Sequence, residues 1–262
     1  MDLLVDGARI FAATGGRAFD PALPAVVFVH GAGMDHTVWT LQTRWFAHHG
    51  RAVLAVDLPG HGRSEGKPLA SVEAMADFMP ALLDAAGATD AAFVGHSMGA
   101  LVALAAAARH PARVRALALL GVAAAMPVHP KLLAAARADA PEAVAMIADW
   151  AFGRRAQLGG AASPGTWMVG GGTRLLERSP RGTLGVDLAA CDAWADGIAA
   201  AKAVRCPVAC VIGAVDRMTP PAGARALVEA LSDVRQTVLP GIGHMAMVEA
   251  PDATLAALAQ AC

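Results

Sequence analysis

The sequence is poor in charge. Only 16% of its 262 residues are charged, and the formal net charge is -1 at pH 7. The basic residues are scattered, so no basic stripe indicates a nucleic-acid partner and no acidic tail indicates a solvating arm. Because 56% of the residues are hydrophobic, the chain has enough apolar surface to fold rather than stay disordered.

Cysteine is scarce as well. The four cysteines form no C-x-x-C pair, and none has a histidine at metal-ligand spacing. We therefore interpret them as reduced thiols that are buried or incidental, and we expect no metal and no other cofactor. These cysteines are Cys191, Cys206, Cys210 and Cys262.

The N-terminus lacks the basic region and the long apolar region of a secretory signal. Residues 91–108 carry no charge and are long enough to suggest a membrane span. The polar and glycine positions inside this stretch lead us to divide it into a buried strand and a core helix instead. We expect a cytoplasmic protein that acts on a small molecule and has no membrane partner, and the sequence leaves the oligomeric state open.

Short apolar runs alternate with segments of helical periodicity. Residues 71–86 show the helical pattern most clearly, with apolar side chains at i, i+3, i+4 and i+7 and Ser71 as N-cap. Such alternation favours an α/β fold, with a mostly parallel sheet covered by helices on both faces. The predicted strands are 25–29, 52–56, 91–94, 114–120, 208–212 and 235–239 after a hairpin of 3–5 and 10–13, and the predicted helices are 38–48, 71–86, 100–105, 221–231 and one from about residue 253.

One long segment interrupts the alternation. Residues 122–195 contain no clear strand, begin with helix formers and become glycine-rich and loop-like between 159 and 172. A stretch of this length without sheet structure is unusual in a compact domain. We interpret it as a helical cap inserted over one end of a core domain formed by 1–121 and 196–262. The alternative is an irregular extra layer without a gating role.

The pentapeptide Gly95-His96-Ser97-Met98-Gly99 reads G-x-S-x-G and lies between a predicted strand and a predicted helix. A serine in this setting occupies a sharp, strained turn that exposes its hydroxyl. The flanking glycines allow the strand and the helix to approach each other. Ser97 is therefore the candidate nucleophile.

A serine hydroxyl needs a base in order to react at neutral pH. His244 lies in a glycine-rich loop after the last predicted strand, at the edge where α/β proteins bind ligands. Asp216 follows the strand 208–212 at the same edge, whereas the loop after 114–120 has no carboxylate. We expect Asp216 to orient His244 as the general base. His61 is interpreted as part of a structural turn.

The tetrahedral intermediate of acyl transfer needs hydrogen-bond donors for its oxyanion. The N–H of Met98, the residue after the serine, is one expected donor. The loop His30-Gly31-Ala32-Gly33, which follows the strand 25–29, should supply the second. We expect this donor to be the N–H of Ala32, with Gly33 as the alternative.

The order Ser97, Asp216, His244, together with the His-Gly start of the oxyanion loop and the turn 57–64, resembles the α/β-hydrolase fold family. The resemblance covers nearly the whole chain except 122–195, which is the family's cap position. It implies an eight-stranded sheet and a Ser-His-Asp triad that acts on esters, thioesters, amides, lactones or, in some members, carbon–carbon bonds and peracids. A serine nucleophile differs from haloalkane dehalogenases, epoxide hydrolases and dienelactone hydrolases. The oxyanion loop also lacks the proline typical of meta-cleavage hydrolases and proline iminopeptidases.

The sequence therefore predicts a serine hydrolase that cleaves a carboxylic ester of a small, largely apolar substrate through an acyl-enzyme. Thioesterase, C–C bond hydrolase and cofactor-free perhydrolase activities are alternatives on the same residues, and a non-catalytic small-molecule receptor is a further one. Apolar side chains of the inserted segment are expected either to line an acyl pocket or simply to pack. They are Met126, Met146, Trp150, Trp167 and Met168.

Overall fold

The computed structural model describes residues 1–162 and 165–262. The strands are β1 (Asp2–Val5), β2 (Ala8–Ala13), β3 (Ala25–Val29), β4 (Ala52–Val56), β5 (Ala91–His96), β6 (Val114–Leu120), β7 (Val208–Gly213) and β8 (Val234–Leu239). They form one sheet in the order β1-β2-β4-β3-β5-β6-β7-β8. β1 and β2 are antiparallel to their neighbours, and the other strands run parallel. This sheet confirms the predicted eight-stranded, mostly parallel α/β-hydrolase architecture.

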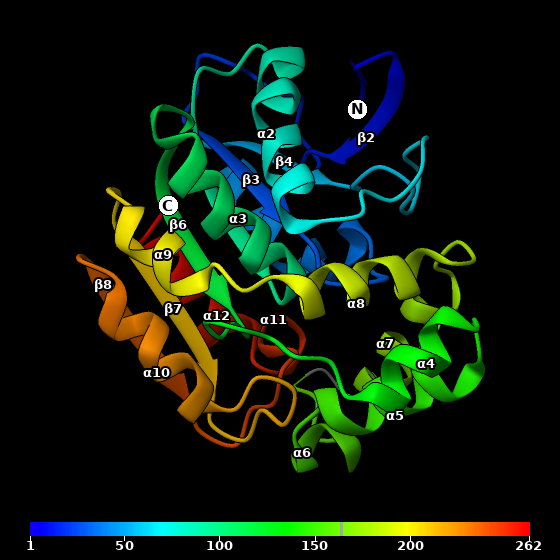
Figure 1. Cartoon of the computed structure of the whole chain (residues 1–262). Coiled ribbons are helices and arrows are strands. Elements are labelled where there is room, and N and C mark those ends of the chain that lie inside the picture. Colours follow the sequence, from blue (N-terminus) through cyan, green and yellow to red (C-terminus); the bar gives the residue numbers. More distant parts are fainter. Residues whose placement is uncertain (163–164) are drawn as a thin grey trace.

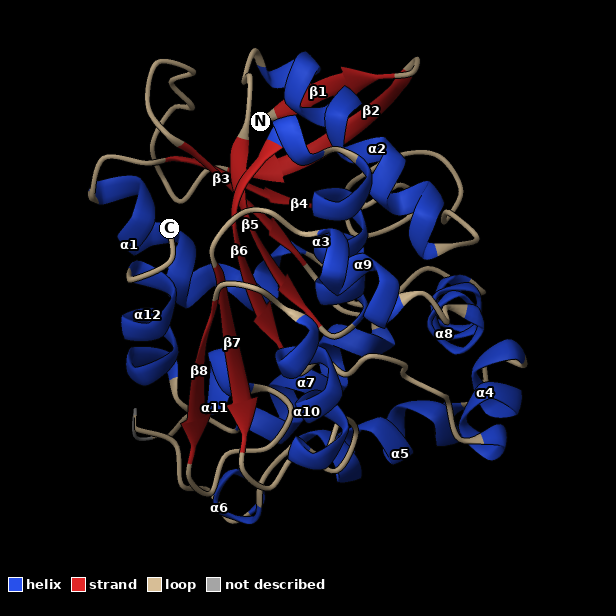
Figure 2. Ribbon diagram, turned by 60° about the vertical axis from the view of Figure 1, so that its left-hand side comes forward, coloured by secondary structure: helices blue, strands red, loops and turns tan. Residues whose placement is uncertain are grey.

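Helices cover both faces of the sheet (Figure 2). One face carries α1 and α12, and the other carries α2, α3 and α9. None of the helices in the described part of the chain is both long and apolar enough to cross a bilayer. The helices outside 122–195 are α1 (Thr40–His48), α2 (Val72–Ala86), α3 (Met98–Arg109), α9 (Gly197–Ala203), α10 (Pro221–Ala230), α11 (Ala246–Glu249) and α12 (Pro251–Ala259), with 3-10 turns at His36–Trp39 and Pro111–Arg113.

The central strands are buried from end to end. Every residue of β3 and β4 is buried, because helices exclude water from both sides of a parallel sheet. This is why these strands appear in the sequence as continuous apolar runs. The stretch 91–108 divides, as predicted, into β5 and α3.

The segment 122–195 contains helices and, within 122–162 and 165–195, no strand. Its helices are α4 (Pro130–Arg137), α5 (Pro141–Ala151), α6 (Arg154–Gln157), α7 (Met168–Glu177) and α8 (Thr183–Ala193). Figure 1 shows them gathered to one side of the sheet, apart from α2 and α10.

The glycine-rich part of this segment is more regular than its composition suggests, because Gly170 and Gly172 lie within α7. A Cβ atom on Gly170 would come within 2.1 Å of the Trp167 ring, and one on Gly172 within 2.8 Å of the Phe152 ring. These two glycines therefore make room for aromatic rings against the helix rather than marking a loop.

Candidate active site

Ser97 lies at the sharp turn between β5 and α3. Its backbone has φ 54° and ψ -119°, a conformation that costs a non-glycine residue about 1–3 kcal/mol. The turn is held on both sides, since the Ser97 N–H donates to the Leu120 carbonyl at 2.9 Å and the Ser97 carbonyl accepts the N–H of Ala100 at 2.9 Å. The Ser97 hydroxyl therefore lies on a turn whose backbone is fixed by hydrogen bonds on both sides.

The glycines on either side of Ser97 are required by close backbone contacts. A Cβ atom on Gly95 would lie 2.2 Å from the Gly99 carbonyl oxygen, and one on Gly99 would lie 2.2 Å from the Val29 carbonyl oxygen. The strand before the serine, the helix after it and the neighbouring β3 therefore touch through backbone atoms alone.

We expect Gly99→Ala to lower the free energy of unfolding by about 3–5 kcal/mol, since the backbone has to move to admit the new methyl group. Urea unfolding followed by circular dichroism measures this change. Gly171→Ala is the matched control, because a Cβ atom there meets nothing within 4 Å and alanine is the better helix former. Equal losses in the two variants would contradict the packing account.

His244 and Asp216 are in contact. Nδ1 of His244 lies 2.8 Å from Oδ2 of Asp216, and both residues are buried. The Thr219 hydroxyl donates to the same carboxylate oxygen at 2.7 Å, and the N–H groups of Met218 and Thr219 donate to the other oxygen. Burial by itself raises the pKa of Asp216, but the adjacent His244 and the Thr219 hydrogen bonds outweigh it and hold this pKa below its ordinary value. Asp216 is therefore a carboxylate that holds the Nδ1 proton of His244.

Thr219 is a site residue that the sequence analysis missed. Its hydroxyl oxygen lies 3.2 Å from Nδ1 of His244 as well as in contact with Asp216. The spacing Asp216-x-x-Thr219 is a local signal for such a contact, because aspartate side chains hydrogen-bond to residues two and three positions further on in a turn.

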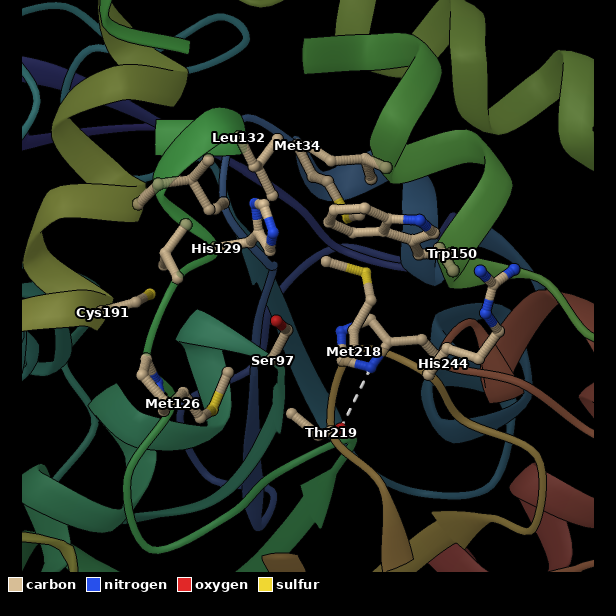
Figure 3. A pocket seen from close by; sticks show the side chains of 17 residues that line it. Met34, Ser97, Met126, His129, Leu132, Trp150, Cys191, Met218, Thr219 and His244 are labelled. Atoms are coloured by element: carbon tan, nitrogen blue, oxygen red, sulfur yellow. Dashed lines mark hydrogen bonds between the residues drawn. The ribbon is translucent and has the colours of Figure 1, made fainter. Parts of the chain in front are cut away.

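The imidazole of His244 is fixed from several sides. Its backbone N–H donates to the Ala151 carbonyl at 2.7 Å, and its carbonyl accepts a hydrogen bond from Nε2 of His96 at 3.1 Å. A Cβ atom on Gly121, which has φ 57°, would lie 2.8 Å from the His244 ring. Nε2 of His244 is buried and has no hydrogen-bond partner within the described residues. Figure 3 shows His244 and Ser97 on the wall of one pocket.

The loop after β3 lies directly beside Ser97, since a Cβ atom on Gly31 would come 3.3 Å from the Cβ of Ser97. The Gly31 carbonyl accepts the N–H of Met34 at 3.1 Å and the Nδ1–H of His30 at 2.9 Å. Burial, together with the neighbouring His61, lowers the pKa of His30 to about 4. His30 is therefore a neutral structural donor.

The N–H of Gly33, the alternative oxyanion donor, is already occupied, because it donates to Oδ2 of Asp187 at 2.8 Å. The N–H groups of Ala32 and Met98 have no partner within 1–162 and 165–262. Of the two residues considered in this loop, the geometry thus leaves Ala32 with a free donor.

The pocket that contains Ser97 and His244 has a volume of about 320 Å³ and a mostly apolar wall. Met126 and Trp150, two of the residues expected there, line it (Figure 3). The sequence had no signal for most of the other lining residues, which come from several separate elements. They include Ala32, Met34, Val128, His129, Leu132, Ile147, Leu188, Cys191, Arg217, Met218 and Thr219.

Three of the expected pocket residues do not line this pocket. Met146 lies one position away from the face of α5 that does, which presents Ile147, Trp150 and Ala151 at i, i+3 and i+4. Trp167 is 69% exposed and, with Met168, borders a separate hollow beside α7. Of the two alternatives, lining and packing, the lining of this pocket is thus excluded for Met146, Trp167 and Met168.

One cluster has the residue types of a metal site. Ligand atoms of Asp35, His36 and Asp57 all lie within 4.8 Å of one another. They already have protein partners, since Asp57 accepts from the N–H and Nδ1 of His36 and Asp35 accepts from Thr37 and Arg178. These contacts are those of a hydrogen-bonded structural cluster, and none of the three residues lines the Ser97 pocket.

Comparison with known proteins identifies the family of the chain. Residues 26–258 match the profile of the alpha/beta hydrolase family. The chain belongs to this family. The α/β hydrolase is 34% identical over 237 residues to a pimeloyl-[acyl-carrier protein] methyl ester esterase of Chromobacterium violaceum, a match that covers 84% of this chain and 87% of that protein.

Two further similarities are more limited. A putative non-heme haloperoxidase of Mycobacterium phage D29 is 36% identical over 128 residues, which is 48% of this chain and 44% of that protein. The crystal structure of the enol-lactonase from Burkholderia xenovorans superposes on the α/β hydrolase with a TM-score of 0.86 at 24% identity, covering 99% and 98% of the two chains. This last comparison supports the fold alone.

Proposed function

We propose that this α/β hydrolase cleaves carboxylic esters of small, largely apolar molecules through an acyl-enzyme on Ser97. The observation that carries the proposal is the state of His244. Its Nδ1 is held by the buried Asp216, while its Nε2 is buried, unpartnered within the described residues and placed in the same pocket as Ser97. An imidazole arranged in this way is a general base that lacks only the group whose proton it takes.

In this mechanism Oγ of Ser97 attacks the ester carbonyl carbon while Nε2 of His244 takes the hydroxyl proton. Asp216 stabilises the imidazolium that forms. The carbonyl oxygen becomes an oxyanion and accepts hydrogen bonds from the N–H groups of Met98 and Ala32, each of which contributes about 3–4 kcal/mol. The tetrahedral intermediate then expels the alcohol, which receives its proton from His244.

The second half of the cycle uses the same groups. Nε2 of His244 takes a proton from water, and the resulting hydroxide attacks the carbonyl carbon of the acyl-enzyme. Collapse of the second tetrahedral intermediate releases the carboxylic acid and returns the proton to Ser97.

The pocket supports a short, apolar acyl group. Met126, Leu132 and Trp150, all from 122–195, line the hollow that contains Ser97. We therefore propose that this segment acts as the cap that sets substrate size. The esterase relative of Chromobacterium violaceum, named for a methyl ester, supports ester hydrolysis over the thioesterase and C–C hydrolase alternatives.

The similarity to a putative haloperoxidase is a specific reason to test the perhydrolase hypothesis. In that reaction hydrogen peroxide, in place of water, attacks the carbonyl carbon of the same acyl-enzyme and releases a peracid. Peracid formation from a short carboxylic acid and peroxide, measured beside ester hydrolysis, separates the two activities.

A fluorophosphonate probe and a series of p-nitrophenyl esters test the proposal. We expect one adduct, on Ser97, and faster hydrolysis of acetate and butyrate esters than of the palmitate ester, because a pocket of about 320 Å³ suits short acyl groups. Peptide mapping by mass spectrometry and initial rates give the two results. Heat-denatured protein is the control for non-specific labelling. An unlabelled Ser97 in a protein that binds a small molecule tightly would favour a receptor instead.

A further inference from the structure

Asp187 on α8 is a buried carboxylate that the proposed mechanism does not use. Its exposed fraction is 0%. Its Oδ2 accepts the N–H of Gly33 at 2.8 Å and lies 2.7 Å from Nε2 of His61. These partners are 154 and 126 residues away along the chain. A side chain from 122–195 therefore contacts the oxyanion loop and the turn after β4 at the same time.

His61 has the hydrogen-bonding pattern of an imidazolium. Nδ1 faces the Pro59 carbonyl at 3.0 Å and Nε2 faces Asp187, so both ring nitrogens meet acceptors. Burial lowers the pKa of His61, but the hydrogen bond and the charge of Asp187 outweigh this, and the pKa lies above its ordinary value. A buried ion pair of this kind is weak evidence for stability but constrains geometry closely.

Asp187 contacts the turn that contains Ala32. Gly31 and Met34 close this turn through the Met34 N–H to Gly31 carbonyl hydrogen bond, and Gly33 has φ 66°. The central peptide of such a turn can adopt either of two opposite orientations. Because the Gly33 N–H belongs to this central peptide, its hydrogen bond to Asp187 selects one of them.

The helix α8 also packs against this turn. A Cβ atom on Gly33 would lie 2.9 Å from Cδ1 of Leu184, one turn before Asp187 on α8. Elsewhere the segment contacts the His244 loop through backbone, where Ala151 accepts the His244 N–H. At the oxyanion loop the polar contact depends on a side chain, so a substitution can remove it.

We infer that Asp187 is a positioning residue that couples the position of α8 to the conformation of the oxyanion loop. The N–H of Ala32 then points toward the oxyanion only when α8 is packed against this loop. The inference rests on the proposed ester hydrolysis at Ser97. Asp187 itself lies outside the pocket lining, so it is expected to act on the rate of the chemical step and not on substrate binding.

The test compares Asp187→Ala and Asp187→Asn with matched substitutions of Asp192. Asp192 lies on the same helix, but its carboxylate accepts the N–H of Val128 instead of a group of the oxyanion loop. We expect Asp187→Ala to lower kcat for p-nitrophenyl butyrate about 10- to 100-fold with KM changed less than about threefold, a part of what the loss of a whole oxyanion donor costs. Asp187→Asn keeps an acceptor oxygen without the charge, so its loss should be about 3- to 10-fold.

A second readout reports on the oxyanion hole itself. A trifluoromethyl ketone adds to Ser97 and places an oxyanion in the hole, whereas the product carboxylic acid binds without this adduct. We expect inhibition by the ketone to weaken in parallel with kcat in the Asp187 variants, while inhibition by the acid stays within about twofold. A purely structural role would change both or neither.

The outcomes separate the inference from the function on which it rests. If Asp187→Ala does not fold, Asp187→Asn decides the question by the same two measurements. A folded Asp187 variant with the kcat and ketone affinity of its Asp192 counterpart overturns the inference and leaves the proposed function standing. A wild-type protein with no hydrolysis and no ketone adduct at Ser97 overturns both.

Discussion

Replacing Ser97 with alanine is expected to lower kcat for p-nitrophenyl butyrate by about 10,000-fold or more. Without Oγ no acyl-enzyme forms, and the remaining groups can only bind substrate and stabilise the oxyanion of a direct attack by water. Initial rates at saturating ester, at protein concentrations high enough to detect the residual activity, measure the effect. A contaminating esterase is excluded by preparing both proteins in parallel.

The fold should survive this substitution. Alanine keeps the Cβ atom, so the strained backbone at φ 54° remains as it is. The backbone hydrogen bonds of residue 97 to Leu120 and Ala100 also remain. The melting temperature of Ser97→Ala is therefore expected within about 2 °C of wild type, since only a small polar group is removed. Unchanged hydrolysis by a folded alanine variant would refute the nucleophile assignment.

Three other buried histidines lie near the site, and their contacts favour His244 over them as the proposed base. Both nitrogens of His30 are engaged, by Gly31 and Leu58. His61 is paired with Asp187. Burial, with the nearby His244, holds the pKa of His96 well below its ordinary value, and this side chain donates to the His244 carbonyl. Of these four histidines, His244 lines the pocket.

The parts of the molecule that the sequence predicts well are those with a local physical signal. β3, β4 and β6 have the predicted bounds. β3 and β4 are buried on both faces and are apolar at every position. Ser97 was predicted from the G-x-S-x-G pattern between an apolar run and a run of helix formers. Asp216 and His244 were predicted because parallel strands bring their carboxyl ends to one edge. In each case a few neighbouring residues carry the whole pattern.

The parts that were missed depend on how distant segments pack. His61 was interpreted as part of a structural turn, but nothing in the sequence points to Asp187 as its partner, since Asp187 lies on a helix with no distinct hydrophobic periodicity. The prediction of the pocket lining was incomplete for a similar reason. The difference between Met146 and Ile147 is a rotation of about 100° on one helix, and only the packing of α5 decides which side chain faces Ser97.

Replacing Asp216 with asparagine is expected to lower kcat about 1,000- to 10,000-fold. The change is nearly isosteric, so its effect is electronic and tautomeric. An amide at this position can offer an N–H to Nδ1 of His244, which moves the imidazole proton to Nε2 and removes the lone pair that would accept the Ser97 proton. The imidazolium of the transition state also loses its counter-charge. Steady-state kinetics with p-nitrophenyl butyrate and the rate of Ser97 labelling by a fluorophosphonate should fall together.

The same substitution has an independent signature in stability. The pKa of Asp216 is lower in the folded protein than its ordinary value, so its ionised form stabilises the fold above the unfolded-state pKa and this contribution is lost as pH falls through the folded-state pKa. Asp216→Asn should therefore show a weaker loss of stability on acidification than wild type. A kcat within about threefold of wild type would mean that another group orients His244, because an asparagine that leaves the imidazole tautomer unchanged cannot be part of the triad.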